Sequence, residues 1–207
     1  MENTNDIPLG CKKITLEDRL DEIDKAIKLG LYQAALGLAL TVPDICRQIE
    51  HPGTKGGRYY EEWFDKHVRD KFMPKINTEE LNYDKRIMNG KICYKLRCAF
   101  LHSGDVEIEE GALSSIKSES DEAYELSYEF ILSEDFDSGG SETTYPKGSE
   151  ENFKKVRKYS TIISIKKLCE NICEAAMEYT QEQKNKDAFN EHNSYYCHVS
   201  KKSEADW

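Results

Sequence analysis

The sequence lacks an apolar run long enough to cross a membrane. Its longest apolar stretch, residues 31–42, is interrupted by polar residues and a glycine and is shorter than the roughly 20 residues that a membrane helix needs. Residues 1–6 carry acids, whereas a secretory signal peptide carries Lys or Arg before an apolar segment. We therefore expect a cytoplasmic protein that does not contact a membrane.

Motifs for metals, cofactors and hydrolytic nucleophiles are also missing. None of the seven cysteines belongs to a C-x-x-C pair, the spacing typical of zinc knuckles and redox-active thiols. Residues 51–57 lack the G-K-[ST] ending of a phosphate-binding loop, and no G-x-S-x-G, H-E-x-x-H or EF-hand pattern occurs. We expect no metal and no cofactor, and thiols that are reduced and packed in the core.

Positive charge is in short supply. The 29 Lys and Arg residues face 39 Asp and Glu residues, which gives a formal net charge of -10. A protein that holds nucleic acid over a wide surface needs many cations on one face. This balance argues against such a surface but leaves room for a small local phosphate site. With 207 residues, of which 38% are hydrophobic, the chain suits one globular domain.

Apolar residues recur every three or four positions along much of the chain, a spacing typical of helices that turn one face to a core. Thr15 and Asp18 resemble a capping pair at the start of the first helix, and Gly30 ends that helix. Gly104 suits the C-terminal cap of a later helix. Helices are predicted over residues 16–29, 31–49 with a bend or break near Pro43, 58–72, 85–101 and 164–179.

The period changes to two over residues 124–132, where Tyr, Leu and Phe alternate with Glu and Ser. This alternation predicts a half-buried strand. Residues 137–151, rich in Ser, Gly and Glu, are predicted to be a flexible loop. Residues 153–159 then return as the second strand of a hairpin inserted at about residues 123–160.

An arginine and a histidine stand close together at the end of a predicted helix. Arg97 carries a planar guanidinium that keeps its charge, which suits a phosphate and a phosphoryl transition state. His102 can exchange a proton near neutral pH, with a ribose 2′-hydroxyl or with a leaving 5′-oxygen. The two side chains together supply the minimum for RNA cleavage without a metal ion.

The spacing of this pair predicts that the two side chains diverge. A five-residue offset leaves them roughly 140° apart around a straight helix. His102 lies where Ser103 and Gly104 can turn the chain, so it can swing toward Arg97 or toward the equivalent pair of a second subunit. The helix C-terminus and Asp105 favour a protonated imidazole, which suits a general acid.

The segment L-R-C-A-F-L-H-S-G over residues 96–104 resembles the motif helix and turn of the HEPN superfamily (higher eukaryotes and prokaryotes nucleotide-binding domains), whose ribonucleases carry R-x4-H. The resemblance implies a homodimer that brings two motifs together and cleaves RNA without a metal. It implies Arg97 as ligand of the phosphate and the transition state, and His102 as acid or base. Such proteins often act in bacterial toxin or abortive-infection defence against phage.

One position departs from the HEPN motif. Many active members have Asn, Asp or His directly after the arginine, whereas this sequence has Cys98. Cys98, Ser103 and Asp105 are therefore grouped as supporting residues of the site. Further candidates for contacts with RNA are Lys95, Arg58 and Tyr59, because cations hold phosphates and tyrosine rings stack on bases.

The resemblance also completes the predicted architecture. It implies a mainly α fold, a HEPN-like up-and-down helical bundle, to which the sequence adds the small inserted β-hairpin. We expect a single domain over residues 1–180, with a polar C-terminal tail over residues 181–207.

Two functions remain open. The first is a metal-independent endoribonuclease that attacks RNA through its own 2′-hydroxyl, with an antitoxin or activator protein as a further partner. The second is a non-catalytic HEPN-like module that binds RNA, a nucleotide or a protein. A purely structural role is the third interpretation, in which Arg97 pairs with an acid and His102 bonds a carbonyl at the helix end.

Overall fold

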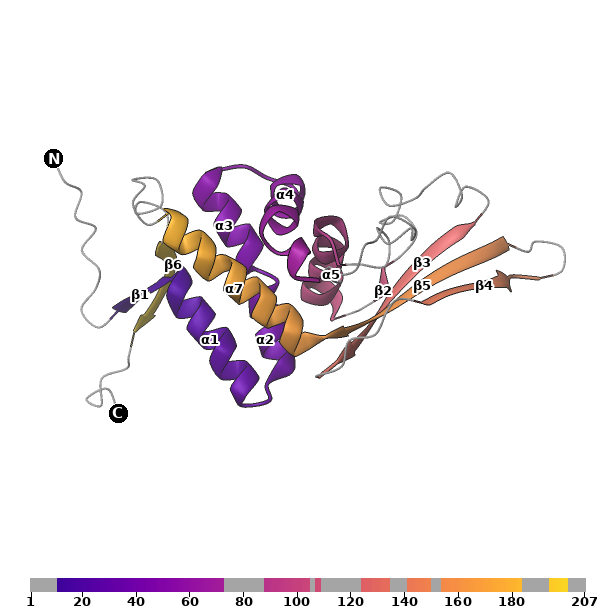
Figure 1. Ribbon diagram of the computed structural model, residues 1–207, viewed down its shortest axis with the longest axis horizontal. Coiled ribbons are helices and arrows are strands. Elements are labelled where there is room, and N and C mark those ends of the chain that lie inside the picture. Colours follow the sequence, from indigo (N-terminus) through magenta and orange to yellow (C-terminus); the bar gives the residue numbers. More distant parts are fainter. Residues whose placement is uncertain are drawn as a thin grey trace.

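The computed structural model describes residues 11–72, 88–104, 107–108, 124–134, 141–149, 154–183 and 194–200. A β-sheet projects from a body of packed helices (Figure 1). In chain order the elements are β1 (Cys11–Thr15), α1 (Leu16–Lys28), α2 (Tyr32–Ala39), α3 (Val42–Glu50), α4 (Arg58–His67), η1 (Arg69–Phe72), α5 (Gly90–Ser103), β2 (Glu107–Ile108), β3 (Glu125–Ser133), β4 (Ser141–Lys147), β5 (Lys154–Ser164), α7 (Ile165–Gln183) and β6 (Ser194–Ser200).

The first helix begins and ends where the sequence predicts. The backbone N–H of Thr15 donates to Asp18 Oδ2 (3.0 Å), and that of Asp18 donates to Thr15 Oγ1 (3.2 Å). Each residue thus satisfies a backbone donor that the helix start leaves open. Gly30 follows α1 with a φ of 70°, a conformation that glycine adopts without steric cost, and the chain turns there into α2.

Two predicted helices are each divided in the structure. Residues 31–49 form α2 and α3, and Pro43 lies in the first turn of α3, where its missing N–H has no helical partner to lose. The break near Pro43 is therefore confirmed. The helix predicted over residues 58–72 ends at His67, and a short 3₁₀ helix follows it.

The helices share one apolar core. Its largest fully buried aliphatic side chains come from α1, α2, α5 and α7, and each contributes roughly 1.5–3 kcal/mol by leaving water. The five cysteines described with their side chains are free thiols, and Cys46, Cys93 and Cys169 are buried, as the sequence predicts. Prominent core residues are Leu16, Ile23, Leu36, Phe64, Ile92, Leu96 and Leu168.

The inserted β region is a four-stranded mixed sheet with the order β2-β3-β5-β4. β3 and β5 are parallel, in register from the Glu125–Val156 pair to the Ser133–Ser164 pair. β2 and β4 add antiparallel edges. The prediction of a hairpin between residues 124–132 and 153–159 is therefore wrong. So is the mainly α, HEPN-like bundle, because the fold is mixed α/β.

The error came from β4, which lies inside the predicted flexible loop. All residues of β4 are exposed, so the strand has no buried face and no apolar alternation to mark it in the sequence. Backbone pairing with β5 holds it, together with ion pairs such as Arg157 Nε to Glu142 Oε1 at 3.2 Å. Because β4 comes between β3 and β5 in the chain and runs opposite to both, the chain has reversed twice when it enters β5, which therefore lies parallel to β3.

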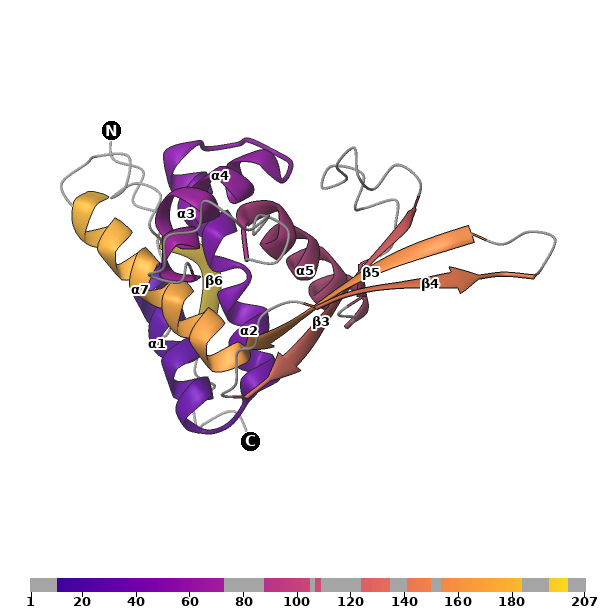
Figure 2. The same ribbon diagram turned by 45° about the vertical axis from the view of Figure 1, so that its right-hand side comes forward.

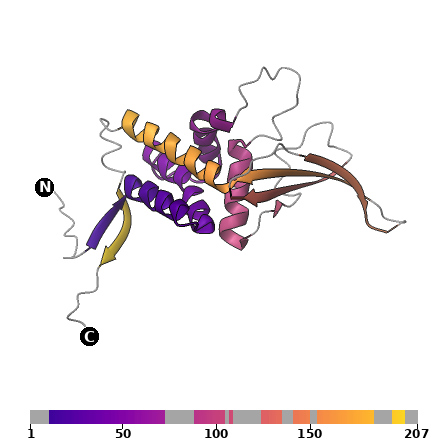
Figure 3. The same cartoon turned by 60° about the horizontal axis from the view of Figure 1, so that its bottom comes forward.

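The sheet and the helical body are joined through α7. β5 continues directly into α7, and Ser164 Oγ accepts from the backbone N–H of Lys167 (3.1 Å), which caps the start of the helix. Figure 3 shows α1 and α7 side by side at this end of the sheet. In the predicted tail over residues 181–207, α7 extends to Gln183 and β6 pairs with β1.

None of the helices in the described ranges combines the length and the apolar character that a membrane crossing requires.

Candidate functional site

Arg97 is held by an acid from a neighbouring helix. It projects from α5 toward α3, where its Nη2 lies 3.0 Å from Asp44 Oδ2. The other oxygen of Asp44 accepts from Arg47 Nε at 2.7 Å. One carboxylate thus lies between two guanidinium groups. The three side chains together carry a net charge of +1.

The contact with Asp44 does not bury the Arg97 side chain completely. Asp44 Oδ2 and Arg97 Nε are both buried and have no hydrogen-bond partner among the described residues. The 3.0 Å contact between Arg97 Nη2 and Asp44 Oδ2 is therefore an ion pair and not a bidentate salt bridge. The side chain of Arg97 keeps 25% of its surface exposed. The Arg97 side chain is therefore partly accessible to solvent.

Electrostatics keeps Arg97 charged. Burial acts to lower the pKa of Arg97, but the negative charge of Asp44 and the contact with Cys98 outweigh it, so the pKa is raised. The Cys98 sulfur lies 4.0 Å from Arg97 Nη1, and the ring centre of Tyr94 lies 5.9 Å from the guanidinium carbon. The Cys98 sulfur and the Tyr94 ring therefore both lie beside the arginine.

His102 lies in the last turn of α5 and is exposed. The helix ends at Gly104, whose φ of 68° is left-handed and confirms the predicted cap. Arg97 and His102 are separated by about 7.5 Å along the axis and roughly 140° around it. Within the described chain no hydrogen bond or ion pair joins them, so one copy of the chain does not assemble the pair.

The supporting residues have different positions. Ser103 Oγ donates to the backbone carbonyl of Ala99 at 2.8 Å, so in this arrangement it serves the helix end. Cys98 is half-buried beside Tyr94, and burial followed by the Cys98 contact raises the pKa of Tyr94. Asp105 lies outside the described residues.

The candidate RNA contacts Arg58 and Tyr59 begin α4, directly after Gly57, which packs against α5. Gly57 packs so closely against Tyr94 that an added Cβ would come within 2.4 Å of the ring. Tyr94 and Arg97 are neighbours on one face of α5, because they are three residues apart. Arg58 is 80% exposed and donates from Nε to Glu62 Oε1 at 2.7 Å.

A tilted aromatic pair lies at the start of α4. The rings of Tyr59 and His51 have their centres 4.5 Å apart, and the Arg58 guanidinium lies 5.9 Å from the Tyr59 ring centre. Lys95, the third candidate RNA contact, is half-buried on α5 and acts to lower the pKa of Glu61, which burial raises. Lys95 thus belongs to the α4–α5 boundary.

Asp44, Arg47 and Tyr94 were missed by the sequence reasoning. No motif connects Asp44 with Arg97, because they are 53 positions apart in the sequence and meet only when α3 packs near α5. The Asp44–Arg47 spacing of three residues is a common surface pair on a helix and does not point to a site.

Figure 2 shows α5 on the side of the helical body that faces the sheet.

The site therefore provides an anchored, partly exposed arginine and a solvent-exposed histidine on one helix. The first can hold a phosphate, and the second can exchange a proton. Within the described residues, no three His, Cys, Asp or Glu side chains gather in a way that could hold a metal ion.

Comparisons of the chain with models of protein families, with curated proteins and with solved structures found no match.

Proposed function

We propose that the chain is a metal-independent endoribonuclease of the HEPN type, which acts in the cytoplasm as a homodimer. The observation that carries the proposal is the state of Arg97. Its guanidinium is kept charged and anchored by Asp44, yet a quarter of the side chain is exposed on the helix whose last turn presents His102. The R-x4-H resemblance supports the same assignment.

In the proposed reaction the 2′-oxygen of the RNA attacks the adjacent phosphorus. One imidazole of the composite site accepts the 2′-hydroxyl proton, the new P–O2′ bond forms, and the P–O5′ bond breaks. A second, protonated imidazole gives its proton to the 5′-oxygen. Arg97 balances the charge that develops on the non-bridging oxygens. The products are a 2′,3′-cyclic phosphate and a 5′-hydroxyl end.

The divergence of Arg97 and His102 on one helix supports a dimer in this mechanism. Two antiparallel motif helices can place the arginine of one subunit near the histidine of the other, which a single helix cannot do. Arg58, Tyr59 and Lys95 are proposed to bind the RNA beyond the cleaved bond. The net charge of -10 suits a short contact with RNA, and we include an antitoxin or activator, as the resemblance implies for toxin or abortive-infection defence.

The test is cleavage of a 5′-labelled RNA of mixed sequence in EDTA by the wild-type protein and two variants, Arg97→Ala and His102→Ala. Wild type is expected to leave 2′,3′-cyclic phosphate ends, and each variant to lose at least about 100-fold in rate, the lower range for general acid–base catalysis. Lys28→Ala is the control, since Lys28 is an exposed cation of α1 and does not contact the residues proposed to cleave or bind RNA.

Two results contradict the proposal. One is intact RNA after incubation with folded, dimeric wild-type protein. The other is equal cleavage by wild type and His102→Ala, which would identify a contaminating nuclease. Circular dichroism and sedimentation of every variant separate loss of chemistry from loss of fold or dimer.

The Asp44–Arg97 contact agrees with an Arg97 that takes no part in chemistry, as in the purely structural interpretation. The second candidate function, a non-catalytic module that binds RNA, a nucleotide or a protein, also needs no catalytic arginine. An arginine engaged by an acid at 3.0 Å has a structural role that needs no substrate. RNA binding by wild type, measured by fluorescence anisotropy without any cleavage, would support this function instead.

A further inference from the structure

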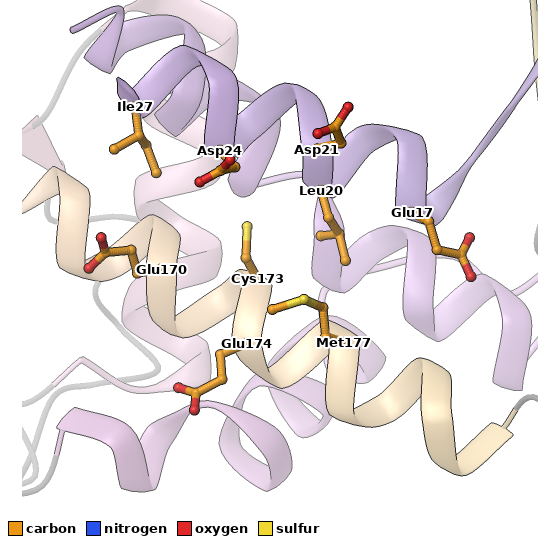
Figure 4. A pocket seen from close by; sticks show the side chains of 9 residues that line it. All are labelled: Glu17, Leu20, Asp21, Asp24, Ile27, Glu170, Cys173, Glu174 and Met177. Atoms are coloured by element: carbon orange, nitrogen blue, oxygen red, sulfur yellow. The ribbon is translucent and has the colours of Figure 1, made fainter. Parts of the chain in front are cut away.

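A groove separates the outer faces of α1 and α7 (Figure 4). It has a volume of about 630 Å³ and none of its lining residues belongs to α5, so its role is independent of the proposed ribonuclease. α1 and α7 run antiparallel along it, as the order of the labelled side chains in Figure 4 shows. The lining extends from Glu17 to Ile27 on α1, about 15 Å at 1.5 Å per residue.

The floor of the groove is apolar. Leu20 and Ile27 of α1 face Cys173 and Met177 of α7 across it. Met177 is 49% exposed although it is a large apolar residue. Its flexible thioether adapts to many apolar surfaces, and its exposure costs free energy unless another molecule covers it.

The rim of the groove is acidic. Five carboxylates line it, and none of the nine lining residues is a cation. Three of the five also have a lysine of the same chain as partner: Lys25 for Asp21, Lys28 for Asp24 and Lys71 for Glu174. The acidic lining residues are Glu17, Asp21, Asp24, Glu170 and Glu174.

The acids also affect the floor. Burial, followed by the charges of Asp24 and Glu170, raises the pKa of Cys173 to about 12. The thiol is therefore protonated at neutral pH and presents an uncharged surface to the groove. An apolar floor between negative edges is complementary to a helix that carries apolar residues on one face and cations beside them.

We propose that the α1–α7 groove binds a basic amphipathic helix of a partner protein. Apolar side chains of that helix at i, i+3 or i+4, and i+7 contact Leu20, Ile27 and Met177, and flanking Lys or Arg side chains pair with the carboxylates. About 15 Å of groove matches roughly three helical turns. A second copy of this chain does not suit the site through the same face, because the same excess of carboxylates over lysines would then lie on both sides.

The experiment uses the full chain and a synthetic peptide of about 14 residues, or four helical turns, with leucines in the stated pattern and lysines elsewhere. A peptide of the same composition with its leucines scattered around the helix is the control ligand. Binding is measured by fluorescence anisotropy at two salt concentrations, and helix formation by circular dichroism. The patterned peptide is expected to become helical on binding and the scattered peptide to bind at least about tenfold more weakly.

Two variants of the groove test its two components. Met177→Ser removes the exposed apolar contact, and the double variant Glu170→Gln with Glu174→Gln removes two rim charges. Each is expected to weaken binding of the patterned peptide by about tenfold, and the double variant also to reduce its salt dependence. The matched control, Glu22→Gln with Glu50→Gln, removes the same charge from exposed positions outside the groove and is expected to keep the affinity.

Three results overturn the proposal. Equal binding of the scattered peptide would show attraction to net charge alone. If Glu22→Gln with Glu50→Gln lost as much affinity for the patterned peptide as the groove variant, the peptide would likewise be attracted by net charge alone. Self-association of the protein that Met177→Ser abolishes, with no binding of the patterned peptide, would identify a second copy of this chain as the occupant.

Discussion

Asp44 is the residue through which α3 is tied to the motif helix. Its carboxylate contacts Arg47 at 2.7 Å and Arg97 at 3.0 Å, and Arg47 extends the cluster by donating to the Thr54 carbonyl at 3.0 Å. All three charged side chains are largely shielded from solvent. When one charge is removed from such a cluster, the remaining charges lose the opposite charge that balanced them. The free energy of unfolding then falls by more than it does when a surface ion pair is lost.

Asp44→Asn is expected to lower the free energy of unfolding by about 1–2 kcal/mol, because two guanidinium groups then lose their shared counter-charge. Urea denaturation followed by circular dichroism measures the change. Asp21→Asn is the matched control, since Asp21 pairs with Lys25 on the surface of α1, with 58% of its side chain exposed, and its loss should leave the midpoint nearly unchanged. Equal shifts in both variants would contradict the role assigned to Asp44.

At the scale of elements, the start of α5 depends on a close approach to α4. A Cβ at Gly90 would lie 2.2 Å from the backbone oxygen of Glu61, and the Gly90 backbone N–H donates to Asp65 Oδ1 at 2.6 Å. Glycine is therefore required there for packing and not for a special φ. At the other end of α5, Gly104 has open space around it but a positive φ, so the requirement is conformational.

Gly90→Ala is expected to destabilise the protein by about 2–3 kcal/mol, because α4 and α5 must separate to accept the methyl group. Gly104→Ala should cost only about 1 kcal/mol, the strain of a left-handed alanine at an unobstructed site. Thermal and urea unfolding of both variants give the comparison. A smaller effect at Gly90 than at Gly104 would show that α4 and α5 do not pack as closely as described.

At the scale of the whole molecule, an aromatic cluster joins α4 to the last helix. The ring centre of His67 lies 5.0 Å from that of Trp63 and 5.6 Å from that of Tyr179. Burial, followed by the charge of Lys66, lowers the pKa of His67 below its ordinary value of 6.5. His67 Nε2 is buried and has no hydrogen-bond partner among the described residues, so the folded state favours the neutral ring.

This pKa shift predicts how stability depends on pH. Below pH 6.5 the unfolded chain binds a proton at His67 more readily than the folded chain does, so the contribution of His67 is complete above 6.5 and is lost as the pH falls through that value. Wild type should therefore lose more stability between about pH 7 and pH 5 than His67→Asn. Urea unfolding across this range measures the difference, and parallel curves for the two proteins would contradict it.

Much of the helical part was predictable because its signals are local. The Thr15–Asp18 capping pair, the glycine at 104 and the apolar spacing of α7 all act within a few residues, and the structure confirms them. Two strands of the sheet, over residues 124–132 and 153–159, were also predictable. Their pairing was not, since β4 between them has no buried face and β5 carries charges that are balanced by acids of other strands, as Lys158 is by Glu129. Strand partners and directions depend on residues far apart in the chain.

The same division holds for the candidate site. The sequence by itself determined the Arg97 and His102 pair on one helix, its end at a left-handed glycine, and the angular divergence that follows from 3.6 residues per turn. Only the tertiary structure decided that Asp44 anchors Arg97, that Gly57 packs against Tyr94, and that α1 and α7 leave an acidic groove. The physical reason is range: caps and helical faces act over one or two turns, whereas ion pairs and grooves arise between elements that only packing brings together.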